Sequence, residues 1–370
     1  MGNTPIPDAV NDCDGRAMTV RPAGHWFAVV VVALLMSGCA GGPAPSAPVA
    51  TPTSGSDLPA QPWLLYEWYP AGADQKSQFI AGADGSSPAE ITADVAIGAE
   101  KVHSDWSPDG MRIAFEALGR DDVDSIWIAD ADGSDAVEAI TCETPDCLQQ
   151  AYPAWSPDGK SILFLGADKT GDVWGKVRIE VVDLDSRDRR TLVETADGLS
   201  AYYTPRWSPD GTRVIAQHET YSEAEDLEIV SSEIVVMPSD GSAPPTPLTD
   251  ASLFAGHADW SPDGSTIVFD SFDLSAFFPA APGDSNLYLM NPDGSNLRQL
   301  TDLTLDGLER IGEPAWTPDG SRIVATRAPL SPSGKAIQNA LIVYVDPVSG
   351  EISETGIQGA EVRLQPVVSP

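Results

Sequence analysis

The sequence predicts an all-β protein, a six-bladed β-propeller of four-stranded antiparallel blades in which the C-terminal strand closes the first blade. Three observations support this fold. A turn motif recurs five times, strand patterns with a period of two residues follow each copy, and the two chain ends carry complementary parts of a sixth unit. The motif is Trp-Ser-Pro-Asp-Gly, with Thr for Ser in the last copy, and it begins at Trp106, Trp155, Trp207, Trp260 and Trp316.

The spacing of the motif matches the length of a propeller blade. Successive copies start 49, 52, 53 and 56 residues apart. Within each copy, Pro presets φ at the second position of a type I turn, and Gly supplies the positive φ that closes a short hairpin. The large flat Trp that precedes the turn can fill the space between two packed sheets. Each copy therefore predicts the reversal between two strands of one blade.

The segments after each motif predict the remaining strands. Apolar residues recur at two-residue spacing directly after the Gly, as in Ile113 and Phe115, and a third apolar strand follows, as in residues 287–290. After most of these strands a second Gly-containing turn precedes a short fourth strand, as at Asp293-Gly294 before residues 297–300. Four antiparallel strands in each repeat form one blade.

The two chain ends predict how the ring closes. Residues 62–92 contain counterparts of the second, third and fourth strands but lack the first. Residues 364–370 match the stretch before a turn, with Val368 in the position that Trp holds elsewhere. We therefore expect the C-terminal strand to complete the first blade, which leaves few exposed strand edges.

A family resemblance supports this architecture. The pattern Pro-Ala-Trp-Ser-Pro-Asp-Gly-Lys-x-Ile-x-Phe at 153–164 and the stretch 287–301 resemble the WD40-like (PD40) repeat of TolB-type β-propellers. The resemblance covers 62–370 and implies the fold, but proteins of many functions share this repeat. Nothing in the chain resembles the Gly-x-Ser-x-Gly nucleophile elbow of the prolyl-peptidase relatives, so we do not expect a serine peptidase.

The N-terminal residues predict export and a lipid anchor. Residues 26–36 form an apolar run too short to span a bilayer, and Leu35-Met-Ser-Gly-Cys39 resembles a bacterial lipobox. We expect 1–38 to be a signal peptide, with Met18 as an alternative start, and Cys39 to be the lipidated first residue of the mature protein. The other interpretation is an ordinary cleaved signal peptide. Residues 39–61 then form a flexible Pro/Ala/Ser/Thr-rich tether that holds the propeller at the membrane, on the periplasmic side or at the cell surface.

Composition and cysteine content limit the partners. The formal charge is −34, from 21 Lys plus Arg against 55 Asp plus Glu, so nucleic acid is not an expected partner. Cys142 and Cys147 are five positions apart and, outside the cytoplasm, predict a local disulfide. We expect a monomer without a cofactor.

The alternation of antiparallel strands assigns the loops to two faces. The tight Ser-Pro-Asp-Gly turns share one face with the turns between the third and fourth strands, and the longer, irregular loops lie on the opposite face, where function is expected. The position three before each Trp opens the innermost strand near the channel mouth on that irregular face. Around the ring these positions are Gln365, His103, Tyr152, Thr204, His257 and Glu313.

Two interpretations of this ring remain open. The side chains could form a ligand, glycan or metal site, or each could hydrogen-bond only to its own neighbouring loop; we predict no metal. The loop containing Phe272, Phe277 and Phe278 is either a cap folded onto its own blade or a hydrophobic contact for a partner.

The sequence thus favours a lipid-anchored scaffold that binds an envelope protein or a glycan. The alternative is a polysaccharide lyase or hydrolase that acts at the channel mouth, with or without the assistance of a metal ion. Its only candidate catalytic residues are His103, His257, Glu313 and Tyr152. We expect a binding protein rather than an enzyme.

Overall fold

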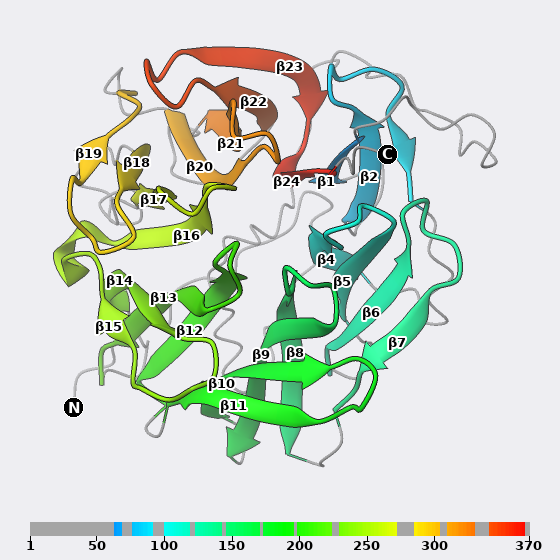
Figure 1. The fold of residues 1–370 in the computed structure, drawn as a ribbon, viewed down its shortest axis with the longest axis vertical. Coiled ribbons are helices and arrows are strands. Elements are labelled where there is room, and N and C mark those ends of the chain that lie inside the picture. The colour runs from blue at the N-terminus through cyan, green and yellow to red at the C-terminus, as the bar shows by residue number, and fades with distance from the viewer. Residues whose placement is uncertain are drawn as a thin grey trace, which may run out of the picture.

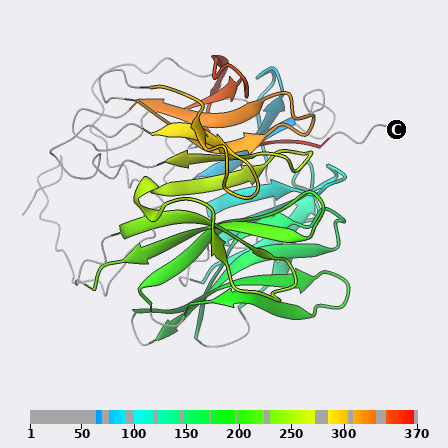
Figure 2. The ribbon, with the colours of Figure 1, turned by 60° about the vertical axis from the view of Figure 1, so that its left-hand side comes forward.

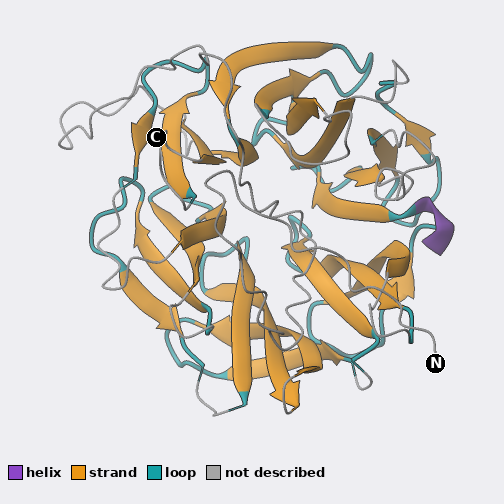
Figure 3. Cartoon of the chain, turned by 180° about the vertical axis from the view of Figure 1, so that it is seen from behind, coloured by secondary structure: helices purple, strands orange, loops and turns teal. Residues whose placement is uncertain are grey.

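The computed structural model describes the propeller as a closed ring of six four-stranded antiparallel sheets. Figure 1 shows the ring along its axis, and Figure 2 shows the same sheets obliquely, after a turn of 60°. Figure 3 shows the ring from behind, with η1 (Ala251–Leu253) at its edge. The predicted fold class is confirmed. The described residues are 63–68, 76–91, 100–118, 123–142, 146–170, 173–195, 198–223, 229–271, 285–303, 309–329 and 340–366. Within these ranges, no helix has the length and apolar character needed to cross a membrane.

Each blade runs outwards from the channel in chain order, except that the first takes its innermost strand from the C-terminus. Blade 1 contains β24 (Ala360–Leu364), β1 (Trp63–Trp68), β2 (Ser77–Gly82) and β3 (Ala89–Glu90). Blade 2 contains β4 (Glu100–Trp106), β5 (Arg112–Leu118), β6 (Ser125–Asp130) and β7 (Val137–Ile140). Blade 3 contains β8 (Cys147–Trp155), β9 (Ser161–Thr170), β10 (Val173–Asp183) and β11 (Arg189–Glu194).

The second half of the chain repeats this arrangement. Blade 4 contains β12 (Ser200–Trp207), β13 (Arg213–Tyr221), β14 (Ile229–Pro238) and β15 (Thr246–Pro247). Blade 5 contains β16 (Ala255–Trp260), β17 (Ile267–Ser271), β18 (Asn286–Met290) and β19 (Arg298–Gln299). Blade 6 contains β20 (Glu309–Trp316), β21 (Ile323–Pro329), β22 (Leu341–Val345) and β23 (Ile352–Gln358).

The closing strand forms as predicted, but its register differs from the prediction by four residues. Leu364, not Val368, takes the place of the motif Trp, since Leu364 pairs with Leu64. Gln365 then takes the place of the motif Ser: its N–H donates to Trp63 O at 2.8 Å, as Ser107 N–H donates to Arg112 O at 2.9 Å. The reason is burial, because this register places Val362 in the core with no exposed surface. The Ser-Pro pair at 369–370, which resembles the Ser-Pro of the motif, had favoured the other register.

The cores lie between neighbouring blades, and the motif Trp side chains help to form them. Trp155 of blade 3 packs with Phe164 and Ile126 in the core between blades 2 and 3. The Arg112 guanidinium of blade 2 lies 4.6 Å from the centre of the Trp155 ring, a cation–π contact. Burial of apolar surface between each two neighbouring blades holds the ring together.

The repeated turn is a structural motif. In every copy the Ser or Thr hydroxyl donates to the Asp carboxylate two residues later, at 2.5–2.7 Å. These hydrogen bonds lower the pKa of Asp210 and of Asp263 to about 2. Gly110 has φ of 67°, and a Cβ added there would meet Pro366 O at 2.3 Å. The motif residues therefore stabilise the hairpin and its contact with the preceding blade.

Candidate functional site

Each of the six innermost strands contains a bulge with one residue in the left-handed conformation. The residues and their φ values are His103 (51°), Tyr152 (53°), Thr204 (46°), His257 (44°), Glu313 (54°) and Glu361 (52°). Five of these are positions that the sequence predicted for the ring. The sixth is Glu361 in place of Gln365, as a consequence of the corrected register of β24.

In five of the six strands the bulge residue donates its backbone N–H to the preceding blade. Five side chains at equivalent positions of the second strands accept these N–H groups, and we call them the acceptor belt: Glu67, Glu116, Gln217, Asp270 and Thr326. Glu67 accepts from His103 N at 2.5 Å, Glu116 from Tyr152 N at 3.4 Å, Gln217 from His257 N at 3.4 Å, Asp270 from Glu313 N at 2.8 Å and Thr326 from Glu361 N at 3.2 Å. Positive φ costs a non-glycine residue on the order of 1–3 kcal/mol. The hydrogen bonds that link the blades offset this cost.

The side chains of the six bulge residues meet around a cavity on the channel axis. His103, Tyr152, Thr204, His257, Glu313 and Glu361 all line it, together with Arg206 and Arg363. The structure thus brings together residues from all six blades. Sequence reasoning missed the two arginines, although both stand in a regular place, two residues after the bulge residue of their strand.

His103 is held in a cluster of buried carboxylates. Its Nδ1 lies 2.6 Å from Glu116 Oε2 and its Nε2 lies 3.6 Å from Glu361 Oε1, and its ring stacks on Tyr152 at 4.1 Å. Burial by itself lowers the pKa of His103, but Glu361 and Glu116 outweigh it and raise the pKa to about 9. Burial and the neighbouring Glu361 raise the pKa of Glu67 to about 7. The cluster therefore holds a protonated imidazole at neutral pH.

His257 occupies the corresponding place on the opposite blade. Its Nδ1 lies 3.0 Å from Asp270 Oδ2, and burial is again outweighed, here by Asp270, so that the pKa of His257 is raised. Burial opposes ionisation of Glu313, yet Arg310 and His257 lower its pKa. Protons compete with metal ions for the ring nitrogens of histidine, and the raised pKa of both histidines strengthens that competition. Among the described residues, no group of three or more His, Cys, Asp or Glu could hold a metal ion.

The raised pKa of His103 predicts a pH dependence of stability. The folded pKa of about 9 exceeds the ordinary value of 6.5, so the folded state binds more protons between these values and stability falls as pH rises through that window. The buried Glu67, with its pKa of about 7 against 4.5, contributes a change of the same sign. We expect a loss of about 3 kcal/mol between pH 6.5 and 9 from His103, on the basis of about 1.4 kcal/mol per pKa unit.

Chemical denaturation across this pH range would measure the effect. The slope of unfolding free energy against pH should be shallower in His103→Gln than in the wild type, because the variant lacks the imidazole that Glu116 and Glu361 surround. Equal slopes for the wild type and His103→Gln would contradict the prediction.

The other predicted site residues lie elsewhere or outside the described ranges. Gln365 is buried beside the turn of blade 2, where its Nε2 donates to Gly110 O at 2.7 Å. Phe272, Phe277 and Phe278 lie outside the described residues, and so do Cys39, the expected signal peptide 1–38 and the tether 39–61. Most of the long loops between second and third strands also lie outside them.

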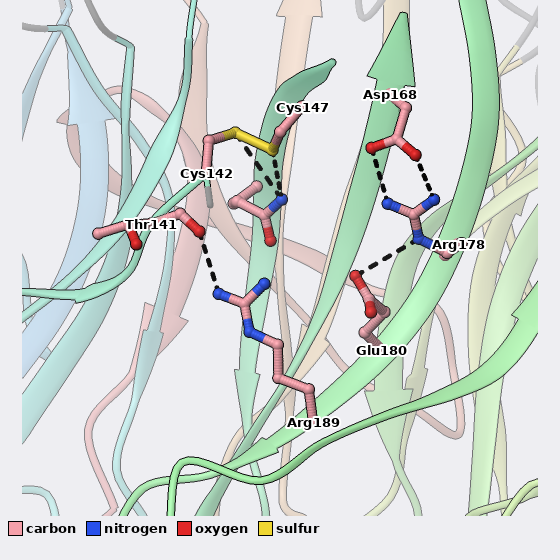
Figure 4. The surroundings of a disulfide bond; sticks show 8 residues. Thr141, Cys142, Cys147, Asp168, Arg178, Glu180 and Arg189 are labelled. Carbon is pink, nitrogen blue, oxygen red and sulfur yellow. Dashed lines mark hydrogen bonds and ion pairs between the residues drawn. A yellow bond between two sulfur atoms is a disulfide. The ribbon is translucent and has the colours of Figure 1, made fainter. Parts of the chain in front are cut away.

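Cys142 and Cys147 form a disulfide with a Cα–Cα distance of 5.4 Å. Figure 4 shows this bond with Arg189 pointing towards Thr141 beside it. Arg189 Nη2 donates to Thr141 O at 3.0 Å, and Gln150 Nε2 lies 3.0 Å from Cys147 Sγ. The loop is short, so loop-closure entropy gives a stabilisation of about 2 kcal/mol. The bond secures the link between blades 2 and 3, and it does not line the axial cavity.

Comparison with known proteins supports the fold and leaves the activity open. No family model matches the chain. It is 30% identical over 194 residues to an uncharacterized protein of Agrobacterium fabrum, covering 50% of this chain and 58% of that protein. It is 30% identical over 136 residues to the uncharacterized peptidase YuxL of Bacillus subtilis, covering 36% of this chain and 18% of the relative. The matches thus span less than two thirds of the length of either curated relative.

Among solved structures, TolB from Acinetobacter baumannii has the same architecture. The TM-score is 0.59 at 19% sequence identity, over 82% of this chain and 66% of that chain. The protein is therefore a propeller of the TolB-like fold. Similarity at this level of identity establishes the fold alone.

Proposed function

We propose that the protein is an exported, membrane-anchored lipoprotein whose propeller binds an envelope protein or a glycan at the mouth of its central channel. The observation that carries this proposal is the axial cavity, to which all six blades contribute a side chain. Concave sites with a few convergent polar groups are where proteins bind ligands. The expected lipid on Cys39 would place this site at the membrane surface.

Contacts between blades explain the backbone conformation of the bulge residues, but they do not explain all of the polar side chains at these positions. The acceptor belt needs only the N–H groups of the bulge residues. Thr204 Oγ1 is buried without a hydrogen-bond partner among the described residues, and Arg206 beside it also lines the cavity. Polar groups left in this way are better explained by a ligand than by closure of the ring.

Binding is better supported than catalysis. A general base must be unprotonated at the working pH, and the carboxylates around His103 raise its pKa to about 9. The Glu313 carboxylate already has two donors: Oε1 accepts from Arg310 Nη2 at 3.4 Å, and Oε2 accepts from Thr326 Oγ1 at 2.7 Å. Tyr152 is buried, and burial raises its pKa well above the ordinary value. Three of the four candidate catalytic groups are thus either protonated at neutral pH or already hydrogen-bonded.

Crosslinking and affinity capture of the intact protein from its own envelope would test the proposal. We expect the wild type in the membrane fraction with a reproducible protein or glycan partner, and Cys39→Ser in the soluble fraction. Thr204→Tyr should fill the cavity and reduce capture at least about tenfold, which corresponds to 1.4 kcal/mol of binding energy.

Val348→Tyr is the matched control for this experiment. Val348 is 83% exposed and lies in the turn between β22 and β23, away from the cavity, so capture should be unchanged. The proposal would be wrong if Cys39→Ser remained in the membrane fraction, if no partner were captured, or if Thr204→Tyr captured it as well as the wild type.

A further inference from the structure

A second layer of side chains lies two residues after the bulge residue of each innermost strand, and four of its six members are charged. From blade 1 to blade 6 these residues are Arg363, Asp105, Ala154, Arg206, Asp259 and Ala315. Arginine, aspartate and alanine therefore repeat in the same order every three blades. In a six-bladed ring this pattern places the two arginines on opposite sides of the channel, and the two aspartates likewise.

The aspartates face the wall of the channel. Asp105 Oδ2 accepts the N–H of Trp155 at 2.9 Å, and Asp259 Oδ2 accepts the N–H of Trp316 at 2.7 Å. Each carboxylate is thus bound to the backbone of the next blade. Arg206 and Arg363, by contrast, line the cavity.

The two guanidinium groups are weakly satisfied for such an enclosed place. Arg206 Nη1 donates to Pro205 O at 3.3 Å and Arg363 Nη1 to Val362 O at 3.2 Å, in each case the carbonyl of the preceding residue. Within the described part of the chain neither makes an ion pair, whereas Arg178, Arg310 and Arg327 all do. A guanidinium carries five N–H donors, so most donors of both groups remain for a ligand.

The two positive charges also act on each other. Burial and the nearby Arg363 lower the pKa of Arg206 to about 10, although Asp105 and Asp259 oppose this change. A bound anion would remove the repulsion between the two cations. The carboxylates at the rim of the cavity already have cationic partners, since Glu361 lies 3.6 Å from His103 Nε2 and Glu313 lies 3.4 Å from Arg310.

We propose that the cavity binds an oxyanion group of a ligand between Arg206 and Arg363. Carboxylate, phosphate and sulfate share the chemistry that two opposed guanidinium groups recognise. The inference deepens the proposed function, because it rests on the channel mouth being the binding site and names the group that enters it.

Titration of the full chain with inorganic phosphate, sulfate and succinate, each at constant ionic strength balanced with NaCl, would test this site. We expect saturable binding of at least one anion by calorimetry, with a matching rise in melting temperature. Arg206→Gln/Arg363→Gln should weaken binding at least about tenfold, because charge-assisted hydrogen bonds are lost. The anion that binds most tightly shows whether the site prefers a phosphate, a sulfate or a carboxylate group.

The matched control is Arg187→Gln/Arg190→Gln. These arginines are exposed at the outer part of blade 3 and also donate to carbonyl groups, of Ala139 and Ser239, so the change in net charge is the same away from the axis. If the glutamine variant fails to fold, Arg206→Lys/Arg363→Lys retains the charge and should show intermediate affinity. The inference would be overturned if no anion bound saturably or if Arg206→Gln/Arg363→Gln bound the anion as tightly as the wild type. It would also be overturned if the control variant lost as much affinity as the channel variant.

The two proposals can fail separately. If Arg206→Gln/Arg363→Gln loses no anion affinity but the wild type captures an envelope partner, the oxyanion site is wrong and the scaffold function stands. If an anion binds through the two arginines and no partner is captured from the envelope, the oxyanion site stands and the scaffold function is wrong.

Discussion

Deletion of residues 359–370 is expected to abolish the cooperative unfolding of the propeller. The free energy of unfolding should fall by more than about 5 kcal/mol, which is the lower end of the stability of a typical domain. The deletion removes β24, the innermost strand of blade 1. It exposes the edge of β1 and removes Val362 from the core between blades 6 and 1. Thermal unfolding followed by circular dichroism and by calorimetry would measure the loss.

Two variants locate the effect in the closing strand. Truncation after Pro366 keeps every described closing contact and should leave the melting midpoint unchanged. Gln365→Ala removes the hydrogen bonds to Trp63 N and Gly110 O and should cost about 1–3 kcal/mol, because buried partners lose their hydrogen bonds. A full deletion that melts at the wild-type temperature would refute closure by β24.

Asp270→Ala is expected to lower the free energy of unfolding by about 3–5 kcal/mol, the range found when one partner of a buried ion pair is removed. Asp270 is only 1% exposed and accepts from both His257 Nδ1 at 3.0 Å and Glu313 N at 2.8 Å. Its removal leaves the partly buried His257 imidazole without its carboxylate and the Glu313 N–H without its acceptor. Urea denaturation at pH 7 would give the free energy of unfolding.

Asp270→Asn serves as the conservative comparison, because the amide keeps one oxygen acceptor for the Glu313 N–H while the negative charge is lost. We expect it to lose less stability than the alanine variant. Asp293→Ala is the surface control: Asp293 accepts from Ser295 N in an exposed turn, and its replacement should cost about 1 kcal/mol or less. If all three variants had the same stability, the acceptor belt would have no part in holding the blades together.

Much of the fold followed from local patterns. The turn motif, the two-residue period and the regular spacing each depend on interactions within one blade, and blades repeat. The register of the closing strand did not follow, because β24 lies about three hundred residues from β1 and its pairing is decided by burial of Val362. Gln365 was therefore assigned to the ring in place of Glu361.

The candidate site was predictable to the extent that it repeats with the blades. Counting back from each motif Trp located His103, Tyr152, Thr204, His257 and Glu313, and the structure places all five around one cavity. The acceptor belt could not be found in this way, since its members differ in residue type and each bonds to the following blade. Arg206 and Arg363 were missed for a similar reason, because nothing local distinguishes an arginine that faces a channel from one that faces solvent.

The sequence by itself determined the number of blades, the strands within them, the reversals that join them and the ring position of five side chains. These features depend on short-range sterics, turn chemistry and hydrophobic alternation. Only the tertiary structure decided the register of the closing strand, the left-handed bulges, the pairing of His103 with Glu116, and the meeting of two arginines across the axis. Those features arise between blades, where the distances in space and the exclusion of water are set by the closed ring as a whole.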